Sequence, residues 1–419
     1  MTDVIIVGAG AAGLMAAREL RRAGKTVLIL EAAPRVGGRV MTLYETSAGV
    51  PVELGAEFIH GDAPETRKLL DEARLVTVPV LGEHYRSNRG ELAPQDAVWK
   101  RMGMVFRRMN PDRRTDRSFQ EFLDEKPGGR SLANERKLAQ GFVQGFNGAD
   151  PSLISEKSLA EQGDPTEGAA EANRIVNGYG ALIDFLTHEV SDFIRASVAV
   201  KRIVRGESGV SVRDEYDNEH SAGAVIVTVP LPLLQDDTII IEPELPTLRN
   251  AAGQLVMGHV ARVTIVVKEI FWERKVPEVS FVHSPERPFN VWWTQNPLRA
   301  PAITGWAGGP PALELMQKGE VEDVVIAELA RAFGTSRARI DRIVESIHTY
   351  DWSQDPHVRG AYSYAGVGGA HAARVLARTF DNSIYFAGEA TESATSGTVE
   401  GALASGRRAA QKVLTASRR

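Results

Sequence analysis

The sequence predicts an α/β fold built as two domains, and three observations lead to this prediction. The chain has 419 residues, more than the roughly 250–300 at which a single hydrophobic core stops growing. Residues 4–31 read as a buried strand, a glycine turn, a helix and a second buried strand, the unit from which parallel sheets are built. Two further stretches with buried strands, 198–229 and 383–414, are separated from this unit by blocks of different composition. We therefore expect one domain assembled from separated pieces and a second formed by insertions.

The composition is that of an ordinary soluble globular protein, with 43% hydrophobic and 25% charged residues. A formal net charge of −5, spread over both signs, gives no argument for a nucleic-acid partner. The chain contains no cysteine, which excludes disulfides, thiolate metal sites, a catalytic thiol and a cofactor linked through cysteine. We expect no metal site. Neither a signal peptide nor a membrane-spanning run of about 18 apolar residues is recognisable, so we expect a cytoplasmic protein without a membrane partner.

The opening elements form a dinucleotide-binding motif. The run Val4-Ile5-Ile6-Val7 is suited to a buried parallel strand, and helix formers occupy 14–23. Between them, Gly8 permits a tight turn, Gly10 lets the backbone approach a pyrophosphate, and Gly13 allows close packing of helix on strand. The free N–H groups and the positive dipole end of the helix would face the phosphate.

The residues after the second strand narrow the choice of cofactor. Glu31 stands at the end of Val27–Leu30, close to the expected spacing of about 20 residues, and would accept hydrogen bonds from ribose hydroxyls. The run EAAPRVGGR at 31–39 then brings Gly37 and Gly38, which allow backbone contact, and Arg39, a bidentate donor to phosphate. This run resembles the glutathione-reductase-type FAD proteins, and specifically their flavin amine oxidase branch, in which it lies along the FAD diphosphate and flavin edge.

The resemblance to flavin amine oxidases continues in five blocks in family order, the first of them in a form similar to polyamine oxidases. The blocks are ELGAEFIHG at 53–61, MGHVAR at 257–262 with Phe271-Trp272, Asp351-Trp352 with GAYSY at 360–364, FAGEAT at 386–391, and GTVEGA at 397–402. The resemblance implies a Rossmann-like FAD-binding domain of the glutathione-reductase type with an inserted α+β substrate domain. It assigns cofactor contacts to Gly8, Gly10, Ala12, Gly13, Glu31, Ala32, Gly37, Gly38, Arg39, Leu54, Gly55, Ala56, Glu57, Val198, Trp352, Gly388, Glu389, Gly397, Thr398, Val399 and Ala402.

The C-terminal block also makes physical sense by itself. Gly388 follows an expected strand over 384–387, and Glu389 can accept hydrogen bonds from ribityl hydroxyls. The helix expected from about Thr398 would turn its N-terminal N–H groups toward the flavin, and its positive dipole end would stabilise the anionic reduced form. The alternative is that Ser396 is only an N-cap and Gly397 only a loop residue.

Two departures from the family pattern bear on the cofactor and the substrate. Monoamine oxidases attach the flavin to a cysteine where this chain has Ala361, so the resemblance implies a noncovalent flavin. The same enzymes frame the amine between two tyrosines. Tyr362 matches the first, whereas Thr398 stands in the second position, as in polyamine oxidases and lysine demethylases. Tyr362 is therefore a candidate catalytic and substrate residue, with an ordinary packed aromatic as the alternative, and Thr398 is a candidate substrate contact.

Two residues of the 53–61 block are further candidates for substrate contact. His60 matches a histidine that lines the substrate channel of polyamine oxidases, or it simply ends a loop before the following helix. The run Asp62-Ala63-Pro64-Glu65 predicts an N-cap, an early proline and a capping box for that helix. Glu57 could pair with a cationic substrate, or be a solvated or salt-bridged loop residue.

Arg262 is the second candidate catalytic residue. Family members generally place a lysine here, which holds a water against the flavin and assists the reaction with oxygen. An arginine is a wider, permanently charged fork, so it could hold the water, bind a substrate carboxylate or turn away into a salt bridge.

Two stretches of opposite charge lie within segment 79–171 of the expected substrate domain. Lys100 to Arg117 is basic and Glu156 to Glu171 acidic; we expect solvated helix faces, with an acidic funnel for polyamines as the alternative.

The resemblance implies an FAD-dependent amine oxidase whose partners are a small-molecule amine and oxygen. Hydride would pass from the carbon next to nitrogen to flavin N5, giving an imine, and oxygen would reoxidise the flavin to yield hydrogen peroxide. Two alternatives stay open: an oxidase or desaturase of a non-amine on the same fold, and a flavin-binding module without turnover. We expect the FAD-binding domain over 1–78, 172–247 and 355–419, and the substrate domain over 79–171 and 248–354. The sequence does not determine the oligomeric state.

Overall fold

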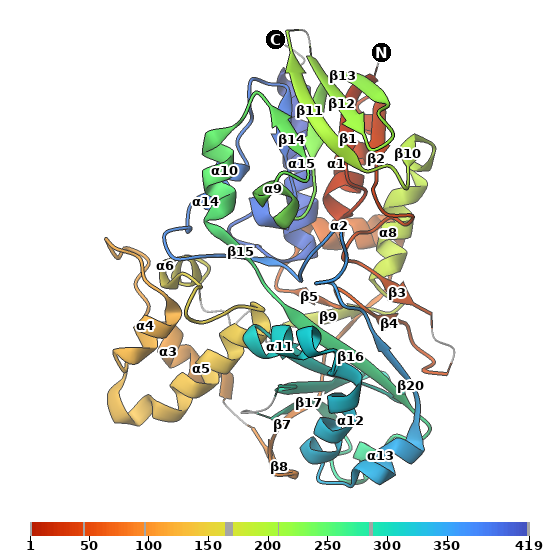
Figure 1. The fold of residues 1–419 in the computed structure, drawn as a ribbon. Coiled ribbons are helices and arrows are strands. Elements are labelled where there is room, and N and C mark those ends of the chain that lie inside the picture. Colours follow the sequence, from red (N-terminus) through yellow and green to blue (C-terminus); the bar gives the residue numbers. More distant parts are fainter. Residues whose placement is uncertain are drawn as a thin grey trace.

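The computed structural model describes residues 2–44, 47–95, 98–163, 171–207, 209–284 and 288–416. Figure 1 shows an elongated molecule with one sheet toward each end and both chain ends at the same end. None of the helices in these ranges is long and apolar enough to cross a membrane.

The first sheet has eight strands and a parallel centre. Its strand order is β10-β2-β1-β13-β12-β11-β14, and β22 also pairs with β13. The strands are β1 (Thr2–Val7), β2 (Val27–Leu30), β10 (Ile194–Arg195), β11 (Val200–Gly206), β12 (Gly209–Asp214), β13 (Glu219–Val227), β14 (Ile240–Glu242) and β22 (Ile384–Phe386). Because β1 runs parallel to both β2 and β13, the carboxyl ends of these strands meet at one edge. The glycine turn follows β1 at that edge.

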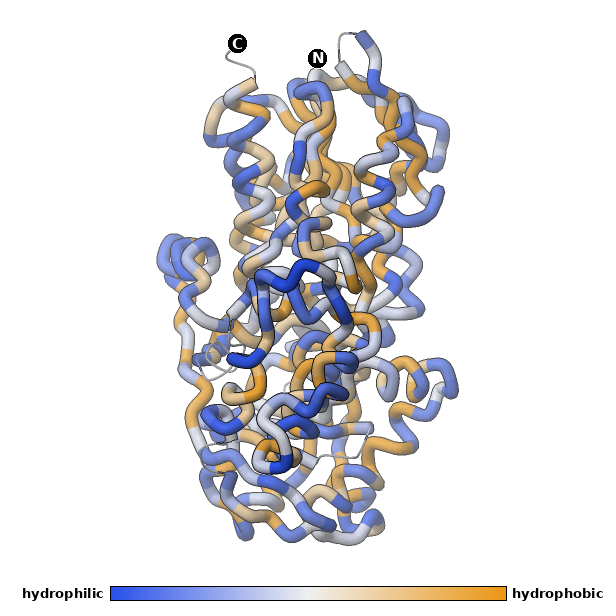
Figure 2. The backbone as a smooth tube through the Cα atoms, turned by 90° about the vertical axis from the view of Figure 1, so that its left-hand side faces the viewer, coloured by the Kyte–Doolittle hydropathy of each residue, from blue (hydrophilic) through white to orange (hydrophobic). Residues whose placement is uncertain are grey.

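Both faces of this sheet are covered, which explains the unbroken apolar run of β1. Val4 and Ile6 join the core cluster that includes residues of four helices, whereas Ile5 and Val7 join a cluster on the other side. The four helices are α1 (Ala11–Arg22), α2 (Pro64–Ala73), α8 (Tyr179–His188) and α15 (Val399–Ala416). On the other side lie α9 (Pro232–Gln235), α10 (Pro246–Gly253) and α14 (Ala372–Leu376). In Figure 2 hydrophobic stretches run through the middle of this part, while outlying turns are largely hydrophilic.

The second sheet has seven strands in the order β20-β16-β19-β18-β17-β7-β8. The strands are β7 (Glu83–Asn88), β8 (Glu91–Pro94), β16 (Val260–Val267), β17 (Val279–His283), β18 (Val291–Thr294), β19 (Ala302–Gly308) and β20 (Val344–Thr349). Its core cluster includes residues of α11 (Pro310–Lys318), α12 (Val321–Ala332) and α13 (Arg337–Ile343). All eight residues of β16, which lies between β20 and β19 in the sheet, are buried.

Short ribbons and a helical group complete the structure. The ribbons are β3 (Thr42–Leu43) with β4 (Val52–Glu53); β5 (Phe58–His60) with β9 (Ala172–Ile175) and β6 (Thr77–Pro79); and β15 (Leu255–Met257) with β21 (Ser363–Ala365). The helices are α3 (Val98–Phe106), α4 (Phe119–Asp124), α5 (Ala133–Phe146) and α6 (Glu156–Glu161), to one side of the second sheet in Figure 1. Short 3-10 turns lie at 129–132, 191–193, 271–274 and 389–391.

The structure differs from the sequence expectations in three local respects. Helix α1 begins at Ala11 rather than Leu14, so Gly13 belongs to its first turn. Glu156 is buried and pairs with Arg117, so the two charged stretches meet each other and are not simply solvated faces. Part of the acidic stretch, 164–170, lies outside the described residues. The expected domain boundary at 247/248 falls inside α10, whose Leu248 joins the core of the first sheet.

The expected capping box of α2 is wrong. Pro64 does open the helix, but Ala63 is the N-cap residue, in a left-handed conformation, and no local side chain caps the helix. The acceptor comes from α15, because the Glu400 carboxylate accepts from the backbone N–H of Glu65 at 3.1 Å and of Thr66 at 2.8 Å. A buried acid from a distant segment therefore replaces the local cap.

Candidate functional site

One large cavity, of about 1550 Å³, extends from the glycine turn after β1 to the wall of the second sheet. All the residues proposed from the sequence for cofactor, substrate and catalysis line it, with Gly13 as the exception. A Cβ on Gly13 would clash with the carbonyl oxygen of Gly8, so its part is the close packing of helix on strand. Segments that are far apart in the chain are thus brought to one cavity.

The glycine turn leaves the start of α1 open to this cavity. Gly10 is the N-cap residue, no side chain in the described part of the chain caps the helix there, and a Cβ on Gly10 would meet nothing within 4 Å. Gly37 and Gly38 take positive φ values of 96° and 56°, and Gly37 forms a β-bridge with Gly10. The two glycine segments therefore lie together as a backbone cradle at a helix N-terminus, an arrangement suited to phosphate.

Glu31 is fixed beside this cradle. Its carboxylate accepts from the backbone N–H of Ala9 at 2.6 Å and of Ala33 at 2.8 Å. Burial raises the pKa of Glu31, while these two N–H groups counteract the rise. Each oxygen has bonded one backbone donor and keeps acceptor capacity for a ribose hydroxyl.

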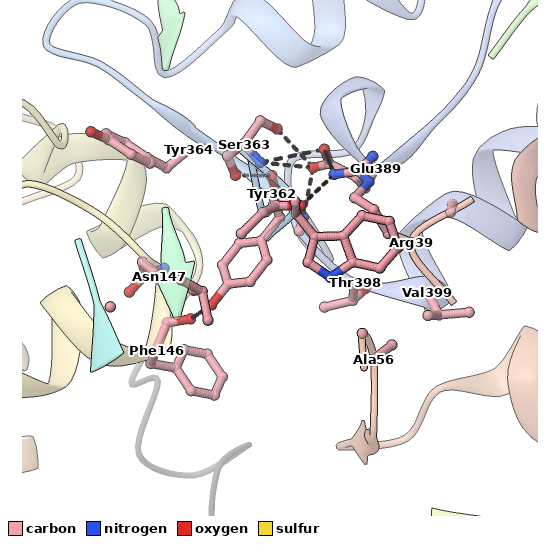
Figure 3. Close-up of a pocket in the computed structure, with 18 of the residues that line it drawn as sticks. Arg39, Ala56, Phe146, Asn147, Tyr362, Ser363, Tyr364, Glu389, Thr398 and Val399 are labelled. Carbon is pink, nitrogen blue, oxygen red and sulfur yellow. Dashed lines mark hydrogen bonds and ion pairs between the residues drawn. The ribbon is translucent and has the colours of Figure 1, made fainter. Parts of the chain in front are cut away.

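Glu389 is the centre of the hydrogen bonds near the start of α15 (Figure 3). It accepts from Arg39 Nη1 at 2.8 Å, from the Ser363 hydroxyl at 2.7 Å and from the Gly397 N–H at 3.2 Å. Arg39 Nη1 also donates to the carbonyl of Ala361 at 2.8 Å. The residue expected to meet ribityl hydroxyls therefore also ties three segments of the chain together. Ser363 was missed from the sequence, although it lies within the GAYSY block.

Tyr362 and Thr398 lie next to each other on the cavity wall, and a Cβ on Gly397 would be 3.1 Å from the Tyr362 ring. Tyr362 points toward Phe146 in Figure 3 and donates to its carbonyl at 2.7 Å. Burial raises the pKa of the Tyr362 phenol, which stays neutral. Thr398, and not Ser396, caps α15: its hydroxyl accepts from the Gly401 N–H at 3.0 Å and donates to the Thr395 carbonyl at 2.7 Å. The hydroxyl oxygen keeps one further acceptor lone pair, and this lone pair and the methyl group are what Thr398 can offer a substrate.

Glu57 is the centre of a buried ion cluster. Its two carboxylate oxygens lie 2.6 Å from Arg174 Nε and 2.6 Å from Arg262 Nη2, and Trp293 Nε1 donates at 3.0 Å. Burial alone would raise the pKa of Glu57, but the two guanidinium groups hold it below its usual value. The structure therefore places Glu57 in the salt-bridged alternative and not beside a cationic substrate. Arg174 lies on β9, and nothing in the local sequence marks it as a partner.

Arg262 shares that cluster and also borders the cavity. Its Nη1 donates to the carbonyl of Gly55 at 3.1 Å, while its buried Nε has no hydrogen-bond partner within the described residues. The guanidinium lies 5.5 Å from the centre of the Trp293 ring. The sequence left three roles for Arg262: holding a water, binding a substrate carboxylate or forming a salt bridge. The structure contains the salt bridge, which Arg262 forms with Glu57.

Besides Trp293 and Trp306, the cavity is lined by seven aromatic side chains that contact one another in turn. Consecutive ring centres lie 4.8 to 6.3 Å apart, and the contacts close a circuit. We call this circuit the aromatic belt; in order of contact it comprises Phe146, His60, Phe58, Phe281, His84, Trp99 and Phe142. His60 is the only member that the sequence reasoning singled out.

The belt includes a histidine that is paired with a second one just outside the circuit. His84 Nδ1 lies 3.2 Å from His283 Nε2, and the rings stack 5.5 Å apart. Burial lowers the pKa of His84 to about 4 and of His283 to about 3, so both are neutral at pH 7. The two lie on β7 and β17, 199 residues apart, which is why no motif revealed them.

Comparisons with known proteins agree with this geometry. The model of the family described as flavin containing amine oxidoreductase matches residues 11–414. Polyamine oxidase 2 of Arabidopsis thaliana is 29% identical over 98% of this chain and 87% of its own length. The lysine-specific histone demethylase 1 homolog 2 of Oryza sativa is also 29% identical, over 99% of this chain, which spans only 57% of that protein.

Two solved structures share the fold over nearly their whole length. Putrescine oxidase bound to putrescine has a TM-score of 0.84 at 23% identity, covering 99% of both chains. Cyclohexylamine oxidase from Brevibacterium oxydans has a TM-score of 0.86 at 22% identity, covering 100% of both.

Proposed function

This chain belongs to the family of flavin-containing amine oxidoreductases, and from that premise we propose that it oxidises a small amine at the carbon next to nitrogen. The product is an imine, which hydrolyses in water. FAD, when bound, would supply the two-electron chemistry: it would take the hydrogen of that C–H bond with its electron pair as a hydride, the nitrogen would release a proton, and oxygen would take up the two electrons and two protons to become hydrogen peroxide. A non-amine substrate on the same fold is the main alternative.

The residues present fit FAD. The cradle of Gly10, Gly37 and Gly38 at the open start of α1 suits the diphosphate. Glu31 suits a ribose, and the N-terminus of α15 offers a positive dipole end to an anionic group. The chain has no cysteine and carries Ala361 at the attachment position, so the cofactor is bound without a covalent link.

One observation carries the proposal: the phosphate cradle and the aromatic belt line the same cavity, together with Tyr362, which bonds to Phe146 of the belt, and Thr398, which caps α15. Tyr362 presents a neutral ring whose hydroxyl is already bonded to Phe146, so it packs against a substrate and takes no proton from it. We expect the apolar rings of the belt, which line the cavity, to displace water around a bound substrate. The protein thereby orients the substrate and keeps it dry, as such a reaction requires.

Anaerobic mixing of the purified holoenzyme with a panel of amines tests the proposal. Loss of the visible flavin absorbance with amines, and not with matching alcohols, is the expected result. Reduction at low amine concentration should rise between pH of about 7 and 9, because the reacting amine must be neutral and free alkylamines have a pKa near about 10.4. Bleaching by non-amines alone would favour the alternative substrate class, and no bleaching at all would favour a flavin-binding module.

A further inference from the structure

The aromatic belt has the properties of a binding chamber for an apolar group. All seven of its side chains line the cavity, and they come from two strands of the second sheet, the ribbon strand β5 and the helices α3 and α5. The closest contact is the stack of Phe281 on His84, with centres 4.8 Å apart, and Phe142 stacks on Phe146 at 5.0 Å. Because each ring packs against its neighbours, the wall is held in place and offers a fixed aromatic surface.

The charged groups near this chamber do not suit a second ammonium. In the described residues of β5, β7, β17, α3 and α5, the charged side chains that line the cavity are Arg86 and Lys137, both cations. Glu314 of α11 also lines the cavity, but it is paired with Lys318. The nearest buried carboxylate, Glu57, is already neutralised by Arg174 and Arg262. Aromatic faces attract cations, but two positive side chains beside the rings oppose that attraction.

We propose that the aromatic belt receives the uncharged aromatic or alicyclic body of a monoamine, whose single nitrogen lies toward Tyr362 and Thr398, and that polyamines are poor ligands. The proposal rests on the proposed function, since it names the substrate class of the same site. His84 and His283 add two ring faces without adding charge. Burying a six-membered hydrocarbon ring against such a wall tightens binding by at least about tenfold through apolar area, which a linear diamine with two solvated ammonium groups does not gain.

Binding of two amines that cannot be oxidised tests the chamber separately from catalysis. 2-Phenylpropan-2-amine has one nitrogen and an aromatic body, and 2,5-dimethylhexane-2,5-diamine has two nitrogens and no ring. Neither has a hydrogen on the carbon next to nitrogen. In calorimetric titrations of the holoenzyme, the monoamine should bind at least about tenfold more tightly. Equal or tighter binding of the diamine would overturn the assignment.

Variants of Trp99 locate the effect in the belt. Trp99→Ala should weaken binding of the monoamine by about tenfold and leave the diamine nearly unchanged, while Trp99→Phe, which keeps a ring, should restore most of the affinity. Tyr216→Ala, which removes an exposed aromatic ring on the turn between β12 and β13, is the matched control and should change neither affinity. Phe142→Leu is a second belt variant, should Trp99→Ala fail to fold. Unchanged monoamine affinity in folded belt variants would also overturn the assignment.

The two proposals fail in different ways. If reactive amines bleach the flavin but binding shows no preference for the monoamine, the belt assignment is wrong and the amine oxidase activity stands. 2-Phenylpropan-2-amine could also bind through the belt while none of the three oxidisable amines, benzylamine, cyclohexylamine and putrescine, bleaches the flavin anaerobically. In that case the substrate class and the proposed function are both wrong.

Discussion

Glu57 and Arg262 form a buried ion pair in which the carboxylate Oε2 lies 2.6 Å from Nη2, and their side chains are only 5% and 7% exposed. Glu57 directly precedes β5 and Arg262 lies on β16, so the pair joins the ribbon beside the cofactor half to the second sheet. Arg174 completes the cluster from β9. Two buried guanidinium groups therefore depend on one carboxylate.

Removal of that carboxylate should destabilise the protein strongly. We expect Glu57→Gln to lower the free energy of unfolding by about 3–5 kcal/mol, because it removes the carboxylate to which both buried guanidinium groups are bonded. Urea unfolding of the holoenzyme measures the change. Asp237→Asn, which breaks the exposed pair with Arg249, is the control and should cost less than about 1 kcal/mol. Similar losses in both variants would mean that the buried cluster is not a stabilising unit.

Arg262→Lys should speed the reaction of the reduced enzyme with oxygen and affect anaerobic reduction less. The arginine fork is committed to Glu57 and Gly55, whereas a compact lysine ammonium can reach a water in the cavity while Arg174 keeps Glu57 paired. Rapid mixing resolves the two half-reactions. Arg174→Lys changes the same cluster behind the cavity wall and should leave the oxygen reaction as it is. If Arg262→Lys matches the wild type in both half-reactions, Arg262 is purely structural.

Glu31→Ala should weaken FAD binding by about 1–3 kcal/mol, because it removes the ribose acceptor and leaves the Ala9 and Ala33 N–H groups unpaired. Glu31→Gln keeps one acceptor oxygen and should lose less. Fluorescence titration of the flavin-free protein with FAD gives both affinities. An affinity equal to that of the wild type in Glu31→Ala would remove the residue from the cofactor site.

Glu53 should make stability depend on pH. Burial raises its pKa to about 7, although Thr42 and the Tyr179 N–H both donate to it at 2.7 Å. Because the folded pKa exceeds the unfolded one, the folded state holds the proton more tightly. The stability that the protonated Glu53 contributes to the fold is therefore present at low pH and is lost as the pH rises through about 7.

Glu53→Gln, which mimics the neutral acid, should therefore gain stability relative to the wild type as the pH rises from about 5 to 8, by on the order of 3 kcal/mol. Unfolding free energies across this range measure the difference. Glu322→Gln, at an exposed position on α12, is the control, and its unfolding free energy should change with pH as that of the wild type does. If the unfolding free energies of Glu53→Gln and of the wild type change with pH in the same way, Glu53 is already ionised at the lower pH.

Acid precipitation should release the flavin completely into the supernatant, because the chain lacks cysteine and has Ala361 at the attachment position. Absorbance of the supernatant against the pellet is the measurement. Yellow colour retained in a washed pellet would reveal a covalent bond to another residue type.

The parts of the fold that could be predicted from the sequence are those made by neighbours along the chain. The strand Val27–Leu30, the glycine turn and Glu31 lie within about thirty residues, where residue periodicity and glycine placement reflect local geometry. The start of α15 near Thr398 was likewise predicted within one residue. In these segments the backbone conformation is set by residues that are close to it in the sequence.

The partners of buried polar groups were not predictable in this way. Glu400 caps α2 from 334 residues away, Arg174 reaches Glu57 across 117 residues, and His84 meets His283 across 199. A buried charge must be neutralised by whichever opposite group the fold brings near, and a local pattern carries no record of that neighbour. The cofactor turn, the family resemblance and the expected cofactor contacts could be read from short local motifs of the sequence, whereas Ser363 and six of the seven rings of the belt could not. Two features could be seen only in the folded protein: the ion pair of Glu57 with Arg262 and the circuit of seven aromatic rings. Both depend on contacts between segments that meet only when the two sheets are assembled.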